Sequence, residues 1–239
     1  MPRTPVWKSI AAELEGEIAQ GLYRPGDKLP TEADLSARFG VNRHTARRAL
    51  GDMAARGIVH SRRGAGVFVT SAPLDYPIGG KVRFTQNIRA SGRLPGRRSL
   101  RIETRPSGPE EAAALELAPG APVIVYEGLS LAEQMPIAHF VSCFPAAPLP
   151  GLAQTLEGTA SITEALRLNG ISDYTRISTR LAAVIASPTQ ARHLGLRDGA
   201  PLLRSESINH DPAGQPVEYG LTWFAGERIT LIVGDTARG

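Results

Sequence analysis

Residues 29–50 read LPTEADLSARFGVNRHTARRAL, and RRGAGVFV follows at residues 62–69. Thr31 and Asp34 have the spacing of a capping box, in which each side chain bonds the backbone of the other at the start of a helix. A glycine turn follows, and Asn42 is a suitable N-cap for a second helix. The glycines of the second stretch interrupt an alternating apolar pattern, which predicts a hairpin. The order of helix, turn, helix and hairpin predicts a winged helix-turn-helix.

The positive charge of the chain is concentrated around this region. Residues 1–72 carry 11 Lys and Arg against 7 Asp and Glu, whereas residues 73–239 carry 16 of each. The whole net charge of +4 therefore lies in the first 72 residues. A local basic excess of this kind is typical of a surface that binds phosphates. The basic residues between positions 38 and 63, against the single acid Asp52, are Arg38, Arg43, Arg47, Arg48, Arg56, Arg62 and Arg63.

Arg43 and Arg47 are four positions apart in the second predicted helix, so they lie on one face. A guanidinium group fits the O6 and N7 acceptors of guanine in the major groove. Glycines in the hairpin allow close approach to the minor groove or the phosphates. A solvated arginine-rich face is the alternative interpretation, but the helix spacing and the hairpin favour DNA. The candidate DNA contacts are Arg38, Arg43, His44, Thr45, Arg47, Arg48, Arg62, Arg63, Gly64 and Gly66.

We expect three segments along the chain. The winged helix-turn-helix occupies residues 1–72, a linker with two prolines occupies residues 73–80, and a second domain occupies residues 81–239. The second domain contains a weak internal duplication, in which the segment from Pro109 can be laid over the segment from Pro188 at an offset of 79. Each copy reads as a short helix, a glycine stop and two antiparallel strands. The fold class is therefore α+β, with helices packed on a pseudo-symmetric antiparallel sheet.

Composition narrows the possible functions. The single cysteine, Cys143, excludes an internal disulfide and a cysteine-based zinc cage, and its apolar surroundings predict a core thiol. There is no apolar run long enough for a membrane span and no signal-peptide core, so we expect a cytoplasmic protein with no membrane partner. Neither a metal site nor a cofactor motif is present in the sequence.

The first 70 residues resemble the GntR family of bacterial repressors, through LPTEADLSARFGVNRHTARRAL and RRGAGVFV. The second half resembles the effector (UTRA) domain of the HutC subfamily, whose fold is similar to chorismate lyase, through EQMPIAHF, SITEALRLNG and PVEYGLTWFAGER. VNRHTARRAL, LDYPIGGKVRFTQNI and YTRIST resemble the PhnF-type regulators of phosphonate operons. The resemblance implies a homodimer that binds an inverted-repeat operator in double-stranded DNA and releases it when a small molecule binds. It places the family's DNA contacts on Arg38, Arg43, Thr45, Arg47 and Gly66.

The same resemblance implies an effector pocket for a small anion, such as a phosphonate or a phosphate ester. A helix N-terminus offers unpaired N–H donors to an anion. In this branch that site corresponds to Arg83, Phe84, Thr85 and Gln86, with Ser161, Thr163 and Glu218 at further pocket positions and Arg176 as a candidate cation. Two departures argue against a sugar phosphate. Gly128 and Ser130 stand where relatives carry paired arginines, and Phe140 stands where they carry an acid.

Two other functions remain open from the sequence. A chorismate-lyase-like enzyme is suggested by fold similarity alone, but no nucleophile motif or carboxylate pair accompanies it. A pyridoxal-phosphate enzyme would need a lysine in the second domain's core, and the only lysines are Lys8, Lys28 and Lys81. A DNA-coating protein without a sensor would not need the second domain of about 160 residues. A regulator of another catabolic operon, of the sugar-phosphate or histidine/urocanate type, is the nearest alternative.

Overall fold

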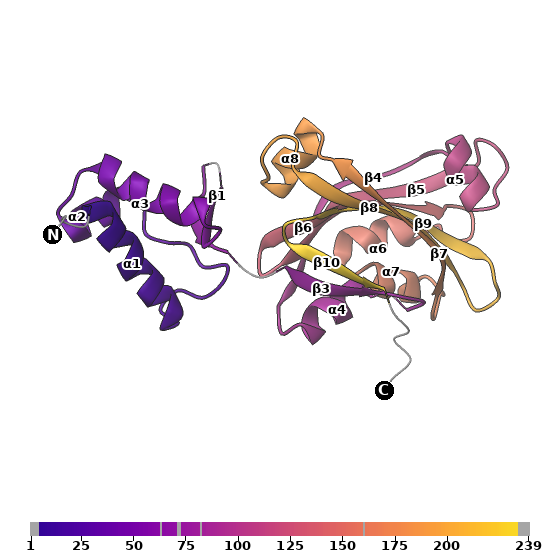
Figure 1. The fold of residues 1–239 in the computed structure, drawn as a ribbon. Helices are drawn as coiled ribbons and strands as arrows, with labels where there is room; N and C mark the ends of the chain where they lie inside the picture. Colours follow the sequence, from indigo (N-terminus) through magenta and orange to yellow (C-terminus); the bar gives the residue numbers. More distant parts are fainter. Residues whose placement is uncertain (1–4, 63, 71–72, 82, 160, 234–239) are drawn as a thin grey trace. The chain divides into compact units, whose positions relative to one another are not determined.

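The computed structural model describes residues 5–62, 64–70, 73–81, 83–159 and 161–233. The chain divides into two compact units, Met1–Ala72 and Pro73–Gly239. Figure 1 shows helices with a small hairpin in the first unit, and a large sheet with helices on both sides in the second. No helix in the described part of the chain is both long enough and apolar enough to span a membrane.

The first unit is a winged helix-turn-helix. Its elements in chain order are α1 (Val6–Ala19), α2 (Glu32–Phe39), α3 (Arg43–Ala55), β1 (Val59–Arg62) and β2 (Gly66–Val69). The two strands form an antiparallel hairpin, as the sequence predicts. The three helices and the hairpin share one core, in which Leu14, Leu35 and Met53 are fully buried.

Both helix starts are capped as the sequence predicts. The Thr31 hydroxyl accepts a hydrogen bond from the Asp34 amide, and the Asp34 carboxylate accepts one from the Thr31 amide. The Asn42 side chain accepts a hydrogen bond from the Thr45 amide at 2.8 Å. Between them Gly40 has φ of +63°, a left-handed conformation that favours glycine and makes the turn. These caps fix where α3 begins and hence which of its side chains face outward.

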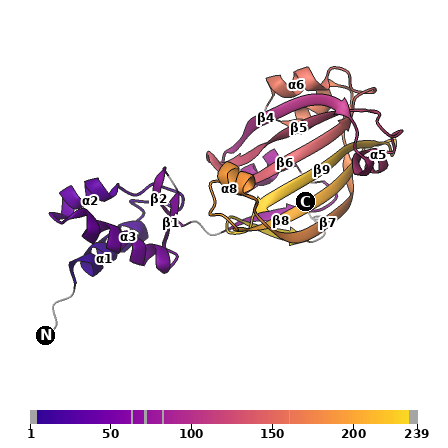
Figure 2. The same ribbon diagram turned by 90° about the horizontal axis from the view of Figure 1, so that it is seen from above.

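The second unit is built on a six-stranded antiparallel sheet. The strands are β4 (Pro95–Pro106), β5 (Pro122–Ala132), β6 (Met135–Pro145), β7 (Thr175–Ile185), β8 (Pro201–His210) and β9 (Pro216–Ala225). Their order across the sheet is β4-β5-β6-β9-β8-β7, which Figure 2 shows. The predicted α+β class, with a winged helix followed by an antiparallel sheet, is confirmed.

The internal duplication corresponds to a pseudo-two-fold axis between β6 and β9. Each half contains an edge strand, a short helix and a hairpin, and the two hairpins meet at the centre. Val141 of β6 pairs with Leu221 of β9, which is its counterpart in the repeat. Glu116 after the first helix has φ of +54°, and its counterpart Gly195 after the second has φ of +62°. The two copies therefore share this backbone conformation, although only the second has glycine there.

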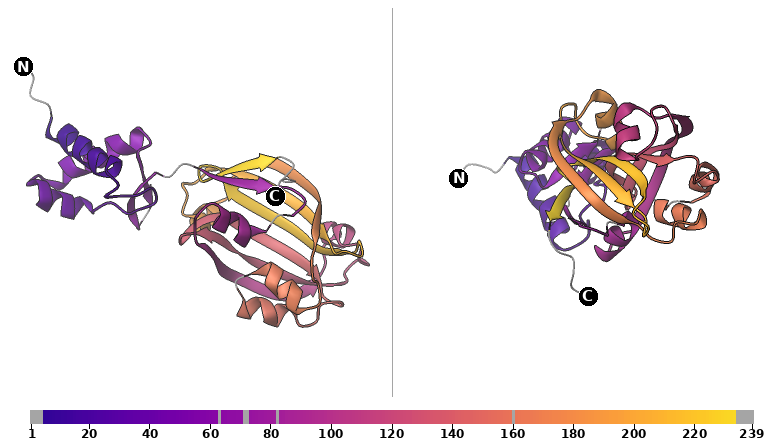
Figure 3. Two further views of the ribbon diagram at one scale, coloured as in Figure 1. Left: turned by 90° about the horizontal axis from the view of Figure 1, so that it is seen from below. Right: turned by 90° about the vertical axis from the view of Figure 1, so that its right-hand side faces the viewer.

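Helices cover the two faces of the sheet differently. The outer face is covered by α5 (Pro109–Ala114) and α8 (Pro188–Leu194), which pack on apolar side chains of β5, β6, β8 and β9. The inner face is covered by α4 (Phe84–Ala90), α6 (Leu152–Gly158) and α7 (Ile162–Leu168). The left view in Figure 3 shows these inner helices in front of the sheet. A polar cavity on this inner face is described below.

The expected linker over residues 73–80 was wrong for most of its length. Residues Leu74–Ile78 form strand β3, which pairs in parallel with β10 (Ile229–Val233). Leu74, Tyr76 and Ile78 are buried against the inner face of the sheet. Pro77 does not prevent strand formation because β3 has a single partner strand, so its missing N–H can face away from the ladder.

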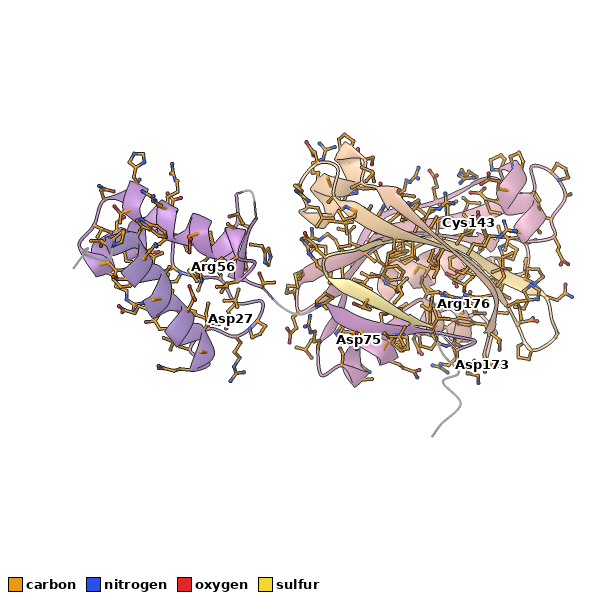
Figure 4. All side chains as sticks on the ribbon, viewed as in Figure 1. Asp27, Arg56, Asp75, Cys143, Asp173 and Arg176 are labelled. Carbon is orange, nitrogen blue, oxygen red and sulfur yellow. The ribbon has the colours of Figure 1, made fainter. Side chains whose placement is uncertain are left out.

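An ion pair on the outer side of the sheet should make stability depend on pH. Arg105 donates two hydrogen bonds of 2.7 Å to Glu111, and this contact holds the pKa of the Glu111 carboxyl at about 2, below its ordinary value of 4.5. The Cys143 thiol, labelled in Figure 4, donates to the same carboxylate at 3.2 Å, and burial raises its pKa to about 12.

We expect the Glu111 ion pair to stabilise the second unit above about pH 4.5 and to be lost as the pH falls toward 2. The contribution is on the order of 2 kcal/mol. Urea unfolding from pH 7 to pH 2.5 should show a smaller acid destabilisation in Glu111→Gln than in wild type. The neighbouring exposed Glu110 gives the matched control Glu110→Gln, which should follow the wild-type curve. If the free energy of unfolding of Glu111→Gln fell with pH as steeply as that of wild type, the Glu111 ion pair would not be a source of the acid destabilisation.

Candidate DNA interface and effector pocket

The outward face of α3 carries the predicted base-reading arginines. Arg43 and Arg47 are both exposed, Arg47 by 65% of its side chain. The Arg47 guanidinium donates two hydrogen bonds, of 2.8 and 2.7 Å, to the Glu32 carboxylate at the start of α2. These bonds lower the pKa of Glu32. Arg47 therefore lies on the outward face of α3 with its guanidinium held by Glu32, and DNA must compete with this carboxylate for it.

Arg38 and Arg48 lie toward α1 instead. Arg38 donates a hydrogen bond of 3.0 Å to Glu13 and two further bonds to Glu17, and its guanidinium stacks over Phe39. Arg48 lies over the Trp7 ring, 4.9 Å from its centroid. To contact a phosphate, either arginine would have to leave these partners. DNA contact by Arg38 and Arg48 therefore stays a prediction.

The start of α3 presents small polar groups. His44 is exposed, and the Thr45 hydroxyl donates to the Asn42 side chain at 3.0 Å. In the hairpin the backbone of Arg62 pairs with that of Gly66, and Gly64 has φ of +75°. Arg63 lies outside the described residues.

Lys28 is a candidate contact that the sequence did not single out. It lies beside the hairpin, where an added Cβ on Gly66 would be 2.7 Å from the Lys28 Cε atom. Lys28, Arg43, Arg47 and Gly66 line one surface groove of the first unit. Three cationic side chains therefore border the groove between α3 and the wing. Sequence patterns indicate a DNA contact at Lys28 only weakly, because it is a single basic residue in a connection that contains prolines and a glycine.

The inner face of the second unit contains a polar cavity of about 90 Å³. Its lining has hydroxyl groups from several strands, two guanidinium groups and one carboxylate. The lining residues are Tyr76, Phe84, Thr85, Arg97, Ser130, Phe140, Ser142, Ser161, Ile162, Thr163, Tyr174, Arg176, Ser205, Asn209, Glu218, Thr222 and Phe224.

Six of the eight predicted effector contacts line this cavity, and two do not. Those that line it are Phe84, Thr85, Ser161, Thr163, Arg176 and Glu218. Gln86 points to solvent on α4. Arg83 is buried elsewhere: it donates to Asp173 at 2.7 Å and to the Tyr174 carbonyl at 2.6 Å, and stacks 3.6 Å from the centroid of the Tyr174 ring. Arg83 therefore supports the cavity wall through Tyr174 and does not face the cavity.

The segment joining β3 to α4 is fastened to the start of β7. Besides the two bonds of Arg83, the Arg176 amide donates to the Gly80 carbonyl at 2.8 Å. Figure 4 labels Arg176 and Asp173, which lie at this end of the sheet. We call Gly80, Lys81 and Arg83 with residues 173–176 the strap. The strap brings Arg176 and the start of α4 to the same cavity.

Arg97 of β4 is the cavity cation that sequence reasoning missed. Its Nε and Nη1 atoms are buried and have no hydrogen-bond partner among the described residues. The guanidinium lies 4.9 Å from the centroid of the Phe140 ring and 5.8 Å from that of Tyr126. Burying unpaired N–H donors of a charged group is costly, so a hydrogen-bond acceptor in the cavity would stabilise Arg97.

The pairing of β4 with β5 explains why Arg97 supplies a positive charge at a position where the sequence of β5 has no arginine. Arg97 pairs with Ser130, one of the two positions where an arginine was expected. At the other position, a Cβ on Gly128 would lie 2.8 Å from both the Phe140 ring and the Arg98 carbonyl oxygen. Glycine at 128 therefore leaves room for the Phe140 ring, over which the Arg97 guanidinium lies.

Glu218 of β9 is the acidic residue of the cavity and is 7% exposed. Its carboxylate accepts a hydrogen bond from the Ser142 hydroxyl at 2.6 Å and one from the Asn209 amide at 2.7 Å. Asn209 in turn accepts from Arg176 at 3.4 Å. The Thr163 and Tyr174 hydroxyls are 2.8 Å apart. The polar side chains of the cavity are therefore oriented by hydrogen bonds to one another.

Comparisons with known proteins agree with these two units. Residues 7–69 match the bacterial regulatory proteins of the gntR family, and residues 90–230 match the UTRA domain. This chain belongs to the GntR family and carries a UTRA domain. It is therefore a DNA-binding transcriptional regulator and not an enzyme.

Relatives match this GntR regulator along nearly its whole length. An uncharacterised HTH-type transcriptional regulator of Rhizobium meliloti is 34% identical, over 95% of this chain and 93% of its own. The probable transcriptional regulator PhnF of Escherichia coli is 34% identical, over 93% and 92%. The crystal structure of PhnF from Mycobacterium smegmatis has the same fold, with a TM-score of 0.65 at 24% identity over 96% of this chain and 100% of that one.

Proposed function

We propose that this regulator is a dimeric repressor that binds an inverted-repeat operator and releases it when a small anion enters the inner-face cavity. The guanidinium of Arg97 carries the proposal, because its buried Nε and Nη1 atoms are unpaired among the described residues and an anion in the cavity would offset its charge. Arg176 supplies a second positive charge at the same cavity. PhnF and NagR relatives named as repressors support the direction of control.

The size of the cavity favours a compact effector. The 90 Å³ present is several times the roughly 10–15 Å³ that admits a single water, so the cavity has room for a small ligand. A phosphonate or a short phosphate ester suits such a space better than a sugar phosphate, which is about twice as large. The resemblance to phosphonate-operon regulators points to the same ligand class, so we propose control of phosphonate uptake or breakdown genes.

The strap offers a route from the effector to the DNA. An anion bound by Arg176 and by the Thr85 end of α4 would pull on both ends of the strap. Strand β3 precedes the strap and follows the DNA-binding unit directly in the chain. The effector changes operator affinity only if it binds the two spacings of a dimer's recognition helices with different affinity. Half-sites about 34 Å apart would suit the binding-competent spacing.

The test combines a ligand screen with operator release. Phosphonates, phosphate esters and sugar phosphates are compared by thermal shift, and each compound that raises the melting temperature is added to the protein–operator complex. The proposal requires at least one compact anion that both stabilises the protein and releases the operator. Ligands that stabilise the protein without changing operator affinity would contradict it.

The exposed edge of β7 is the proposed dimer surface. β7 is an edge strand, and it presents Ile177, Leu181 and Ile185 with exposed fractions of 60%, 44% and 68%. Val233 of β10, 75% exposed, lines a shallow hollow together with Ile177 and Leu181. An inverted-repeat operator requires a two-fold dimer, and such a dimer buries the same patch of both copies. A second copy would cover both the apolar side chains and the unpaired strand edge.

We expect Ile185→Glu to convert the dimer to a monomer, because the interface would bury an unpaired carboxylate. Light scattering after size-exclusion chromatography measures the mass. Leu168→Glu, on α7 and 60% exposed, is the matched control and should remain dimeric. A dimeric Ile185→Glu variant would place the interface on another surface.

A further inference from the structure

The cavity holds three charged side chains that have no ionic partner. Arg97, Arg176 and Glu218 all line it, and no ion pair among the described residues includes any of them. Arg83 and Arg228, which are buried elsewhere in the second unit, have charged partners: Arg83 is paired with Asp173, and Arg228 is paired with Glu227 and donates to the Pro136 and Leu194 carbonyls. The three charged side chains of the cavity have no such partner among the described residues.

The buried Glu218 carboxylate would be stabilised more by a cation than by a further neutral hydrogen-bond donor. Its two carboxylate oxygens already accept hydrogen bonds from Ser142 and Asn209, which carry no net charge. A carboxylate that is 7% exposed pays a desolvation cost that neutral donors offset only in part. Each oxygen has a further lone pair, so an ammonium group can be added without displacing either neighbour.

From these charges we propose that the effector is a zwitterion, with a phosphonate or phosphate group between the arginines and an ammonium group at Glu218. This inference rests on the proposed function and specifies its ligand. Two guanidinium groups and one carboxylate match a doubly charged anion that carries one ammonium. With the phosphonate as a dianion, the ligand's net charge of −1 balances the net charge of +1 on the three cavity side chains, and each charged group of the ligand then meets an opposite charge.

A hydroxyl group is the competing partner for Glu218, as in a sugar phosphate or a hydroxyalkyl phosphonate. It would donate a hydrogen bond but would leave the carboxylate charge unbalanced. Both groups would make a charge-assisted bond to the carboxylate, but only the ammonium also neutralises its buried charge, so the ammonium should be preferred. The ammonium and the hydroxyl can be distinguished by comparing the affinities of ligands that are nearly equal in size.

The experiment uses the full-length protein and three probes: ethylphosphonate, 2-hydroxyethylphosphonate and 2-aminoethylphosphonate. Isothermal titration calorimetry at pH 7 measures each affinity. We expect the amino compound to bind at least tenfold more tightly than either of the others. Equal binding of the amino and hydroxy compounds, or of the amino and ethyl compounds, would overturn the zwitterion. Failure of all three compounds, and of phosphate, to bind would instead overturn the anion cavity itself.

Glu218→Gln removes the carboxylate and keeps a side chain of the same shape. The preference for the amino over the ethyl compound should fall below threefold in this variant. Glu206→Gln changes an acid of the neighbouring strand that is paired with Arg180 outside the cavity, and should keep the full preference. If Glu218→Gln does not fold, the three-ligand comparison on the wild-type protein still decides the proposal.

Discussion

Replacing Arg97 with methionine should weaken binding of the anionic effector by at least about 30-fold, because removing one partner of a buried, hydrogen-bonded charge pair costs roughly 2–5 kcal/mol. Methionine fills a similar volume among Phe140, Tyr126 and Phe84 without carrying charge. The operator affinity without effector should stay at the wild-type value. The variant would therefore repress but no longer respond.

The same substitution should leave the ligand-free protein at least as stable as wild type. The Nε and Nη1 atoms of Arg97 have no partner among the described residues, so their removal ends a desolvation cost. A structural arginine would behave in the opposite way, with a lower melting temperature in the variant. Combined loss of ligand response and unchanged or raised stability therefore separates a ligand-binding role from a packing role.

Arg98→Met is the control for this experiment. Arg98 is the next residue of β4 and is exposed, so its side chain lies on the opposite face of the sheet. Effector affinity in this variant should be unchanged within a factor of two. Equal losses in Arg97→Met and Arg98→Met would mean that the strand, and not the guanidinium in the cavity, had been disturbed.

Local features of the fold could be predicted from the sequence because their causes are local. The capping box at Thr31, the N-cap at Asn42 and the turn at Gly40 depend on residues within a few positions, and all three are confirmed. The duplication also predicted the symmetric sheet, because each repeat carries its own helix and hairpin pattern. The linker was wrong because a proline-containing segment can form a strand when it has a single partner strand.

The cavity was only partly predictable because it is assembled across the sheet. Phe84, Thr85 and Glu218 were expected there from resemblance, whereas Arg97 comes from a strand whose register with β5 no local pattern reveals. Gly128 was interpreted as a missing cation, but it makes room for an aromatic ring. The positive charge is on β4 beside Ser130 and not on β5, and this placement can be recognised only when the pairing of the two strands is known.

Arg47→Ala should weaken operator binding about 5- to 150-fold and relax the requirement for one base pair in each half-site. A bidentate contact to guanine discriminates by base, whereas a phosphate contact would weaken all sequences equally. Binding is measured against the operator and against a set carrying each single substitution. Arg56→Ala is the control at the opposite end of α3, because Arg56 is paired with Glu15 and Asp52 on the first unit. Equal weakening across all sequences would reassign Arg47 to the backbone.

Replacing Glu32, the partner of Arg47, gives a second test of how this ion pair affects DNA binding. DNA must compete with the Glu32 carboxylate for the guanidinium, and an exposed pair of this kind is weak. Glu32→Gln should therefore raise operator affinity by about two- to fivefold, partly by removing a negative charge near the phosphates. In an Arg47→Ala background the part due to competition disappears, so the gain should be smaller. An undiminished gain would mean that Glu32 acts on DNA through its charge alone, and that the pair does not hold Arg47 back from the groove.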